Sequence, residues 1–392
     1  MKTIALVEYN WIGHYVFYIK AFAKIFIQCG YRVAIYCKNP SEIMAWVHKE
    51  FAEHESEIRV YNLTVPSIRI LAPLLQRHSM LALQRWLICL CRLITTRSLP
   101  DYVFFLSIDN FIIPWPITWC INLIFQYEWF CLFVHPDSFR TTMPAFYAKY
   151  DFLSIFRLRK CKAVFVFDEG VVVDFAKTIN RSIIHAIPDI ADVSVNEQAG
   201  RDLKRVLIEK ANGRKIVGLF SPVRENKGTM TLIDVALTTK NSNLFFFLCG
   251  LFLESGYSRA NYSKIKLLQG KCPENMHFVS GFIEDEGVYN SLFRSVDIIF
   301  AAFVNYYSSS NTLTKAAFFK KPVVVSKGYC MASRVEMYNL GISVPESNVP
   351  ECSKALDELD SNYLEYVSRA DFTNYYLHHS KQALLPIVKK VI

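Results

Sequence analysis

Residues 215–237, KIVGLFSPVRENKGTMTLIDVAL, contain the pattern that decides the fold. An apolar run of strand length, residues 215–220, is followed by a polar loop, and Gly228 then opens a run with helical spacing. Further apolar runs of strand length follow, separated by helical segments, at residues 244–248, 277–279, 297–301 and 322–325. Alternating strands and helices predict a parallel sheet with helices on its faces.

The N-terminal half of the chain repeats this alternation. A helix over residues 15–29 ends at Gly30, and the expected strands are residues 3–7, 32–37, 58–63, 102–106, 130–134 and 163–167. The sequence therefore predicts an α/β protein with two parallel-sheet domains, residues 1–200 and 201–370, joined near the polar stretch 192–214. The tail, residues 371–392, looks helical and is expected to pack back on one domain, with the N-terminal domain favoured.

Composition excludes several classes of protein. The chain has 392 residues, of which 52% are hydrophobic and 20% charged, so a disordered chain is excluded. Its eleven cysteines are odd in number and scattered, which favours reduced thiols over disulfides or a zinc site. The first eight residues are too short an apolar run for a signal peptide, so we expect the chain to stay in the cytoplasm.

The net charge of +9 raises the question of an anionic partner. Nucleic acid is the weakest reading, because the aromatic residues lie in apolar strands and are not interleaved with basic ones. Residues 67–97 contain five arginines and no acid, and residues 111–133 are apolar with three tryptophans, Trp115, Trp119 and Trp129. Two interpretations stay open: contact with the inner face of an anionic membrane, or core helices of the sheet.

Two loops of the C-terminal half could bind a diphosphate. Arg224 and Lys227 lie between a strand and the start of a helix, where cations and helix N–H groups suit phosphate oxygens. A second candidate precedes the helix of residues 313–319 and consists of Ser308, Ser309, Ser310 and Asn311. An ordinary basic loop and a plain helix cap are the respective alternatives.

Three residues of the N-terminal half could reach the cleft expected between the domains. His135 follows an apolar strand, and ligands of open parallel sheets bind outside the carboxyl ends of the strands. Gly13 and His14 follow the first strand, and the glycine permits close backbone approach to a ligand. A structural histidine and a plain turn are the alternatives. The chain contains neither G-x-G-x-x-G nor a P-loop motif.

The order and spacing of these segments resemble the GT-B glycosyltransferases of the family 4 type. Val217 to Phe220 with Lys227 to Ala236 resembles the start of that family's nucleotide-binding domain, and the run from His277 through Gly281 to Phe282 resembles its "V.F.G" strand. Residues 315–324, KAAFFKKPVV, resemble "EAMA.G.PVV", and residues 13–33 resemble the family's N-terminal opening. The resemblance implies two Rossmann-like domains facing a cleft, with acceptor binding in the N-terminal domain and donor binding in the C-terminal one.

The resemblance also implies an activity and a site. It implies transfer of a sugar from a nucleotide-diphosphate sugar to a glycan or lipid-linked glycan in polysaccharide biosynthesis, with retention, without a metal and with no cofactor beyond the donor. His135 would act at the donor sugar, and Gly13, His14, Gly281, Tyr307 and Lys315 would line the cleft. The family usually has two glutamates eight positions apart where this chain has Tyr307 and Lys315. A catalytically inactive GT-B-like binding protein is therefore the alternative function.

Overall fold

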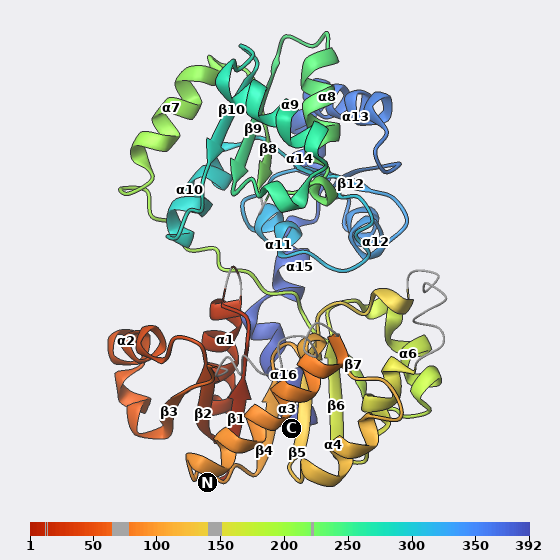
Figure 1. Ribbon diagram of the computed structural model, residues 1–392. Helices are drawn as coiled ribbons and strands as arrows, with labels where there is room; N and C mark the ends of the chain where they lie inside the picture. The colour runs from red at the N-terminus through yellow and green to blue at the C-terminus, as the bar shows by residue number, and fades with distance from the viewer. Residues whose placement is uncertain (12, 14, 65–77, 140–150, 221–222) are drawn as a thin grey trace. The chain divides into compact units, whose positions relative to one another are not determined.

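The computed structural model describes residues 1–11, 13, 15–64, 78–139, 151–220 and 223–392, which form two compact units (Figure 1). The first unit combines Met1–Pro188 with Lys381–Ile392, and the second is Asp189–Ser380. Each unit has one sheet in which every neighbouring pair of strands is parallel. The predicted α/β architecture with two parallel-sheet domains is therefore confirmed.

The first unit has a sheet of seven strands in the order β3-β2-β1-β4-β5-β6-β7. These strands are β1 (Thr3–Val7), β2 (Arg32–Cys37), β3 (Ile58–Asn62), β4 (Tyr102–Phe105), β5 (Glu128–Phe133), β6 (Cys161–Val166) and β7 (Ile184–Ala186). Apart from short 3-10 turns, the helices in the described part of this unit are α1 (Tyr15–Gln28), α2 (Pro40–Glu50), α3 (His78–Thr95), α4 (Thr118–Ile124), α6 (Val172–Ile179) and α16 (Lys381–Val391).

Helices cover both faces of the first sheet. Successive residues of β4 point to opposite faces: the Phe104 ring lies 4.9 Å from the ring of Phe22 on α1, and the Phe105 ring lies 4.9 Å from that of Trp86 on α3. Strands buried on both faces are apolar along their whole length, which explains why β1 and β2 are readable as continuous apolar runs.

The described part of the basic segment is a core helix. Helix α3 buries Trp86 completely, and the Trp86 indole N–H donates to the Phe111 carbonyl oxygen at 2.8 Å. Arg85, one of the five arginines of this segment, also turns inward, because its guanidinium donates to the carbonyl and side-chain oxygens of Asn110 at 2.9 and 3.1 Å. Arg69 and Arg77 lie outside the described residues. No helix in the described part of the chain is long and apolar enough to cross a bilayer.

The second unit has a sheet of six strands in the order β10-β9-β8-β11-β12-β13. The strands are β8 (Lys215–Phe220), β9 (Leu244–Gly250), β10 (Met276–Ser280), β11 (Ile298–Ala301), β12 (Val323–Ser326) and β13 (Gly341–Val344). The helices are α7 (Arg201–Ala211), α8 (Thr229–Thr238), α9 (Arg259–Gly270), α10 (Glu286–Ser295), α11 (Asn311–Phe318), α12 (Cys330–Met337), α13 (Val349–Ser361), α14 (Tyr363–Arg369) and α15 (Phe372–His378).

The boundaries between the units differ from the predicted ones. The second unit begins at Asp189 because the segment after it is bonded to α10: Asn290 donates to the carbonyl oxygens of Asp192 and Ser194 at 3.0 and 2.8 Å. The polar stretch expected as the join contains helix α7. The tail is divided, because Phe372 and Tyr375 of α15 lie in the second core whereas α16 packs against α1 in the first unit.

Candidate functional site

The order in which the chain adds strands to the second sheet reverses between β8 and β11. The chain leaves β8 for β9 on one side, whereas β11 lies on the other, and ligands of open parallel sheets bind where such loops diverge. The loops that follow β8 and β11 touch, because the Val304 N–H donates to the Asn226 carbonyl oxygen at 2.9 Å. Gly228 permits this approach: its φ is +72°, and a Cβ there would lie 2.3 Å from the Ala302 carbonyl oxygen. Both predicted diphosphate loops therefore meet at one edge of the second sheet.

Lys227 is the central cation of this edge. Its ammonium nitrogen lies 4.0 Å from the ring centroid of Phe303 and 4.1 Å from that of Tyr306. Among the described residues we find no carboxylate within ion-pair distance of it. Desolvation, helped by the positive charge of Arg224, lowers its pKa to about 8. A half-buried cation that contacts two aromatic rings and no carboxylate among the described residues can still bind an anion.

Arg224 adds a second positive charge three residues before Lys227. Its side chain is exposed and its stem packs against Gly256, where a Cβ would lie 2.9 Å from the Arg224 Cγ atom. The main chain of Arg224 is fixed, because the Thr229 hydroxyl donates to its carbonyl oxygen at 2.8 Å. The loop therefore presents one fixed, half-buried cation and one exposed cation.

The serines after β11 are buried and have structural contacts. The Ser309 hydroxyl donates to a carboxylate oxygen of Asp189 at 2.6 Å and accepts from the Arg334 guanidinium at 2.5 Å. Ser310 is the N-cap of α11 and accepts from the Thr312 N–H at 3.4 Å. Ser308 is also buried, and Asn311 is half-buried as the first residue of α11. These contacts hold the serine hydroxyls and the Thr312 N–H at the start of α11, so an anion there would be bound by the other backbone N–H groups of the first turn.

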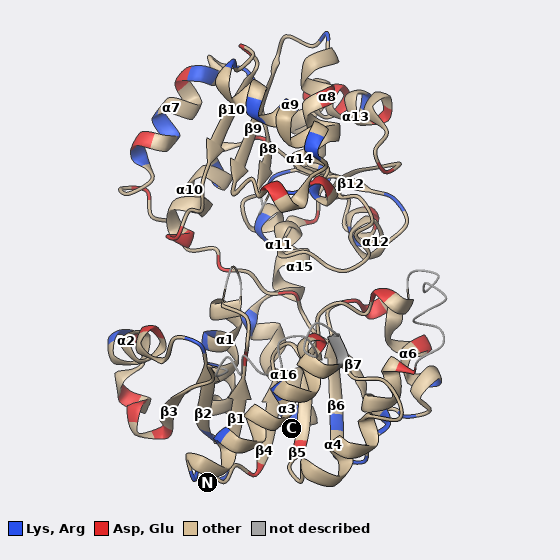
Figure 2. Cartoon of the chain, viewed as in Figure 1, with Lys and Arg blue, Asp and Glu red and all other residues tan. Residues whose placement is uncertain are grey.

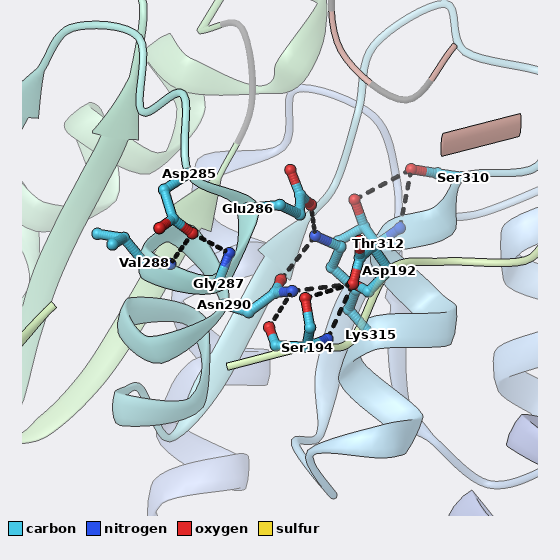
Figure 3. A network of polar contacts seen from close by, with 10 residues as sticks. All are labelled: Asp192, Ser194, Asp285, Glu286, Gly287, Val288, Asn290, Ser310, Thr312 and Lys315. Carbon is cyan, nitrogen blue, oxygen red and sulfur yellow. Dashed lines mark hydrogen bonds and ion pairs between the residues drawn. The ribbon is translucent and has the colours of Figure 1, made fainter. Parts of the chain in front are cut away.

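Lys315 is buried inside a polar network that joins three segments of the second unit (Figure 3). Its side chain is only 4% exposed, and its ammonium donates to a carboxylate oxygen of Glu286 and, at 2.7 Å, to the Asn290 amide oxygen. Desolvation lowers the pKa of Lys315, and the charge of Glu286 opposes that effect. Glu286 and Asn290 belong to α10, and Asp285 caps this helix by accepting from the N–H groups of Gly287 and Val288 at 2.7 and 3.1 Å. Lys315 therefore connects α11 to α10.

The other two predicted residues of the second unit lie in loops at the carboxyl edge of its sheet. The ring of Tyr307 packs edge-on against that of Tyr329 at 4.6 Å, and its hydroxyl donates to the Asn305 amide oxygen at 3.3 Å. Gly281 follows β10 with a φ of +144°, and its N–H donates to the Gly250 carbonyl oxygen at 3.1 Å. The roles of Tyr307 and Gly281 as ligand contacts remain predictions.

In the first unit, His135 lies at the carboxyl edge of the sheet. Its side chain is exposed, and the N–H groups of Val134 and His135 donate to the two carboxylate oxygens of Asp109 at 3.0 and 2.9 Å. Gly13 lies in the exposed loop after β1 with a φ of +79°, and His14 is outside the described residues. The backbone of His135 is therefore fixed, and its contact with a donor sugar remains a prediction.

Sequence reasoning did not select two acids at the carboxyl edge of the first sheet, Glu8 and Asp109. Glu8 directly follows β1 and is fully buried, and desolvation raises its pKa to about 8. One of its oxygens accepts from the Asn10 N–H at 2.6 Å, and the other has no hydrogen-bond partner among the described residues. The signal was available, since Glu8 is a carboxylate that ends an apolar strand. The bonds of Asp109 could not be read from sequence, because they join separate loops.

The sequence matches no protein-family model and no curated protein. Solved structures do resemble the whole chain. HepE from Anabaena in complex with UDP-glucose has a TM-score of 0.69 at 14% identity, covering 100% of this chain and 99% of its own. WaaG, a glycosyltransferase involved in lipopolysaccharide biosynthesis, has a TM-score of 0.68 at 14% identity, covering 99% of each chain.

An enzyme of another kind is also similar. UDP-GlcNAc 2-epimerase from Neisseria meningitidis, bound to UDP-GlcNAc, has a TM-score of 0.58 at 12% identity, covering 100% of both chains. At such identities the likeness shows the fold alone. The fold is GT-B, as the sequence motifs imply, and the reaction must be argued from the site.

Proposed function

We propose that this chain transfers a sugar from a uridine diphosphate sugar to a hydroxyl group of a glycan or lipid-linked glycan, with retention of anomeric configuration. The observation that carries the proposal is Lys227, a half-buried ammonium against two aromatic rings, with no carboxylate in ion-pair distance among the described residues. A cation in that state at the ligand-binding edge of a parallel sheet is suited to an anionic ligand.

The proposed donor rests on the chemistry of this edge and on the neighbouring structures. A diphosphate offers oxygens to both Lys227 and Arg224 and to the N–H groups at the start of α11. HepE binds UDP-glucose and the epimerase binds UDP-GlcNAc, which supports uridine diphosphate sugars as the first donors to test. Retention and the glycan acceptor rest on the sequence resemblance to family 4 transferases.

The chemistry asked of the described residues is electrostatic. As the bond from sugar to phosphate breaks, negative charge grows on the leaving diphosphate, and cations already in place stabilise that charge more than they stabilise the bound donor. Lys227 and the start of α11 need little rearrangement, because their surroundings fix them. His135 stays a proposed contact of the donor sugar, and no catalytic base is assigned to it.

The test is donor binding and turnover together. Calorimetry with UDP, UDP-glucose and UDP-GlcNAc should give a dissociation constant for each, and a phosphate-coupled assay should detect slow release of UDP in the absence of acceptor. Failure of uridine, guanosine and adenosine diphosphate sugars alike to bind would refute the proposal. Release of free UDP without an acceptor would support a transferase, whereas conversion of UDP-GlcNAc to an epimer would indicate the other chemistry found on this fold.

A binding protein without catalytic activity is the second candidate. Tyr307 and Lys315 stand where family 4 transferases usually carry two glutamates, and Lys315 is committed to Glu286 and Asn290. Such a protein would bind UDP and UDP-glucose with similar affinity but release no UDP over hours, with or without a panel of glycan acceptors. The two candidates therefore differ in turnover and agree in nucleotide binding.

A further inference from the structure

Strand β7 forms one edge of the first sheet. In the part of the chain that the structure describes, it pairs with β6 alone, and its other side has no neighbouring strand. The Ile183 carbonyl oxygen accepts from a β6 N–H at 2.8 Å, and the Ile187 N–H donates to a β6 carbonyl oxygen at 2.9 Å. Because successive residues turn their backbone groups to opposite sides of a strand, the N–H and carbonyl groups of Ile184 and Ala186 point away from β6. The outer side of β7 is therefore a template for a further strand.

A groove flanks β7 on each face of the sheet. The first groove, of about 710 Å³, extends from Ile184 and His185 to Pro386 of α16, and the second, of about 550 Å³, extends from Ile184 to Val173 of α6. Helix α16 packs on the face covered by α1, whereas Phe175 of α6 belongs to the core on the face covered by α3. The side chains of a strand added to β7 would alternate between the two faces, so they would enter the two grooves in turn.

The two grooves are basic. Their charged lining residues, of the kind drawn blue in Figure 2, are Lys162 and Lys390 in the first groove and Lys177 and Arg181 in the second. No aspartate or glutamate lines either groove among the residues that the structure describes. Two acids lie nearby: Glu128 pairs with Lys162 at 2.7 Å, and Asp174 of α6 is exposed outside both linings.

The other three cations of the grooves have no carboxylate partner. The Arg181 guanidinium donates to three backbone carbonyl oxygens, which are neutral, at 2.9, 2.8 and 2.8 Å. Lys177 and Lys390 are exposed, and in the described ranges we find no carboxylate within ion-pair distance of either. Burial, followed by the charge of Lys390, lowers the pKa of His185, which places this charge close to β7. The edge of the sheet is therefore complementary to an anionic partner.

We propose that β7 binds an extended, acidic peptide segment of another protein, which pairs with Ile184 and Ala186 as a further strand of the first sheet. Main-chain hydrogen bonds to a sheet edge supply affinity, and pockets for alternate side chains supply specificity. Carboxylates of the peptide complement the cations of the two grooves. A second copy of this chain would instead bring the same cations face to face.

The proposal does not depend on the proposed glycosyl transfer. Strand β7, α6 and α16 all belong to the first unit, whereas Lys227 and the start of α11 belong to the second. Peptide binding and UDP binding can therefore succeed or fail separately, and each variant below is titrated with both ligands.

The experiment uses the full chain and a fluorescently labelled, capped peptide of about eight residues that alternates glutamate and valine. Fluorescence anisotropy should show saturable binding that weakens as salt is raised, and a matching lysine–valine peptide should not bind. Ala186→Pro should lower the affinity about tenfold, because proline removes the outward N–H. Proline is tolerated in an edge strand where the N–H faces away from the sheet, so the variant should fold.

Two further measurements do not depend on the folding of the proline variant. Lys177→Glu with Lys390→Glu reverses two exposed charges and should lower the affinity for the acidic peptide by about tenfold or more. Hydrogen exchange of the wild type should slow at the N–H groups of Ile184 and Ala186 when the acidic peptide is bound.

The matched control is Lys240→Glu with Lys271→Glu, which makes the same change in net charge at two exposed lysines of the second unit. This variant should bind the acidic peptide as the wild type does. Absence of peptide binding, or equal affinity of the wild type and either a folded Ala186→Pro or the charge-reversed variant, would overturn the proposal. A self-association that Ala186→Pro abolishes, without peptide binding, would assign the edge to a second copy and would also overturn it.

Discussion

Replacing Lys227 with methionine should weaken nucleotide binding and, at the same time, stabilise the protein without ligand. Methionine keeps an unbranched apolar side chain beside Phe303 and Tyr306 but removes the charge. A residue that costs stability and is needed for a ligand is typical of a functional site. The two effects have opposite signs, so a merely structural lysine could not produce both.

The size of each effect follows from the surroundings of the ammonium group. A pKa lowered from 10.5 to about 8 corresponds to ~3 kcal/mol of unfavourable free energy for the charged form at neutral pH. Attraction to the two rings offsets roughly 1–2 kcal/mol of this. The unliganded variant should therefore gain about 1–2 kcal/mol. Loss of a hydrogen bond to a charged diphosphate should cost about 1.5–3 kcal/mol, or roughly 10–150-fold in the dissociation constant for UDP.

The assays are thermal unfolding of the unliganded protein and calorimetric titration with UDP, both at pH 7. Lys266→Met is the matched control, because Lys266 is an exposed lysine of the same unit whose ammonium also lies over a ring, that of Tyr262, at 5.4 Å. The control should change neither quantity appreciably. A Lys227→Met variant that binds UDP as tightly as the wild type, or that melts at a lower temperature than the wild type, would refute this reasoning.

Three further predictions concern pH and packing. The affinity of the wild type for UDP should fall as pH rises through about 8, where Lys227 loses its proton, and calorimetry of Lys227→Met should show no such step. Glu8→Gln should raise the melting temperature at pH 8 but leave it unchanged at pH 4.5. Burial raises the pKa of Glu8 to about 8, so the wild type loses stability as pH rises from 4.5 to 8. An equal gain in melting temperature at both pH values would contradict this. Lys315→Glu should lower the melting temperature more than Lys315→Met, because the new carboxylate would face Glu286 and the Asn290 amide oxygen. A Lys315→Glu variant that melts at a higher temperature than Lys315→Met would contradict this.

The fold was predictable because its strands are buried on both faces. The runs at residues 3–7, 32–37 and 215–220 coincide with β1, β2 and β8 to the residue. The three-residue edge strand β7 was missed, because so short a strand leaves no apolar run to detect. The polar stretch near residue 200 was misread as a join, since α7 buries little more than Leu207 and Ala211 and is otherwise a polar helix.

The candidate site was predictable in its loops and not in its contacts. Strand, loop and helix order placed Arg224, Lys227 and the start of α11 at one edge of the second sheet. The aromatic rings beside Lys227 and the buried contacts of Ser309 join residues far apart in the sequence, so no local pattern reveals them. The same holds for Lys315, whose partner Glu286 lies 29 positions away.

The most direct test of the account is a crystal structure of the protein with UDP bound. The account predicts that the diphosphate lies at the carboxyl edge of the second sheet, with its oxygens within hydrogen-bond distance, about 2.7–3.2 Å, of the Lys227 ammonium and of backbone N–H groups at the start of α11. A UDP molecule bound elsewhere, with Lys227 still lying only against Phe303 and Tyr306, would contradict it.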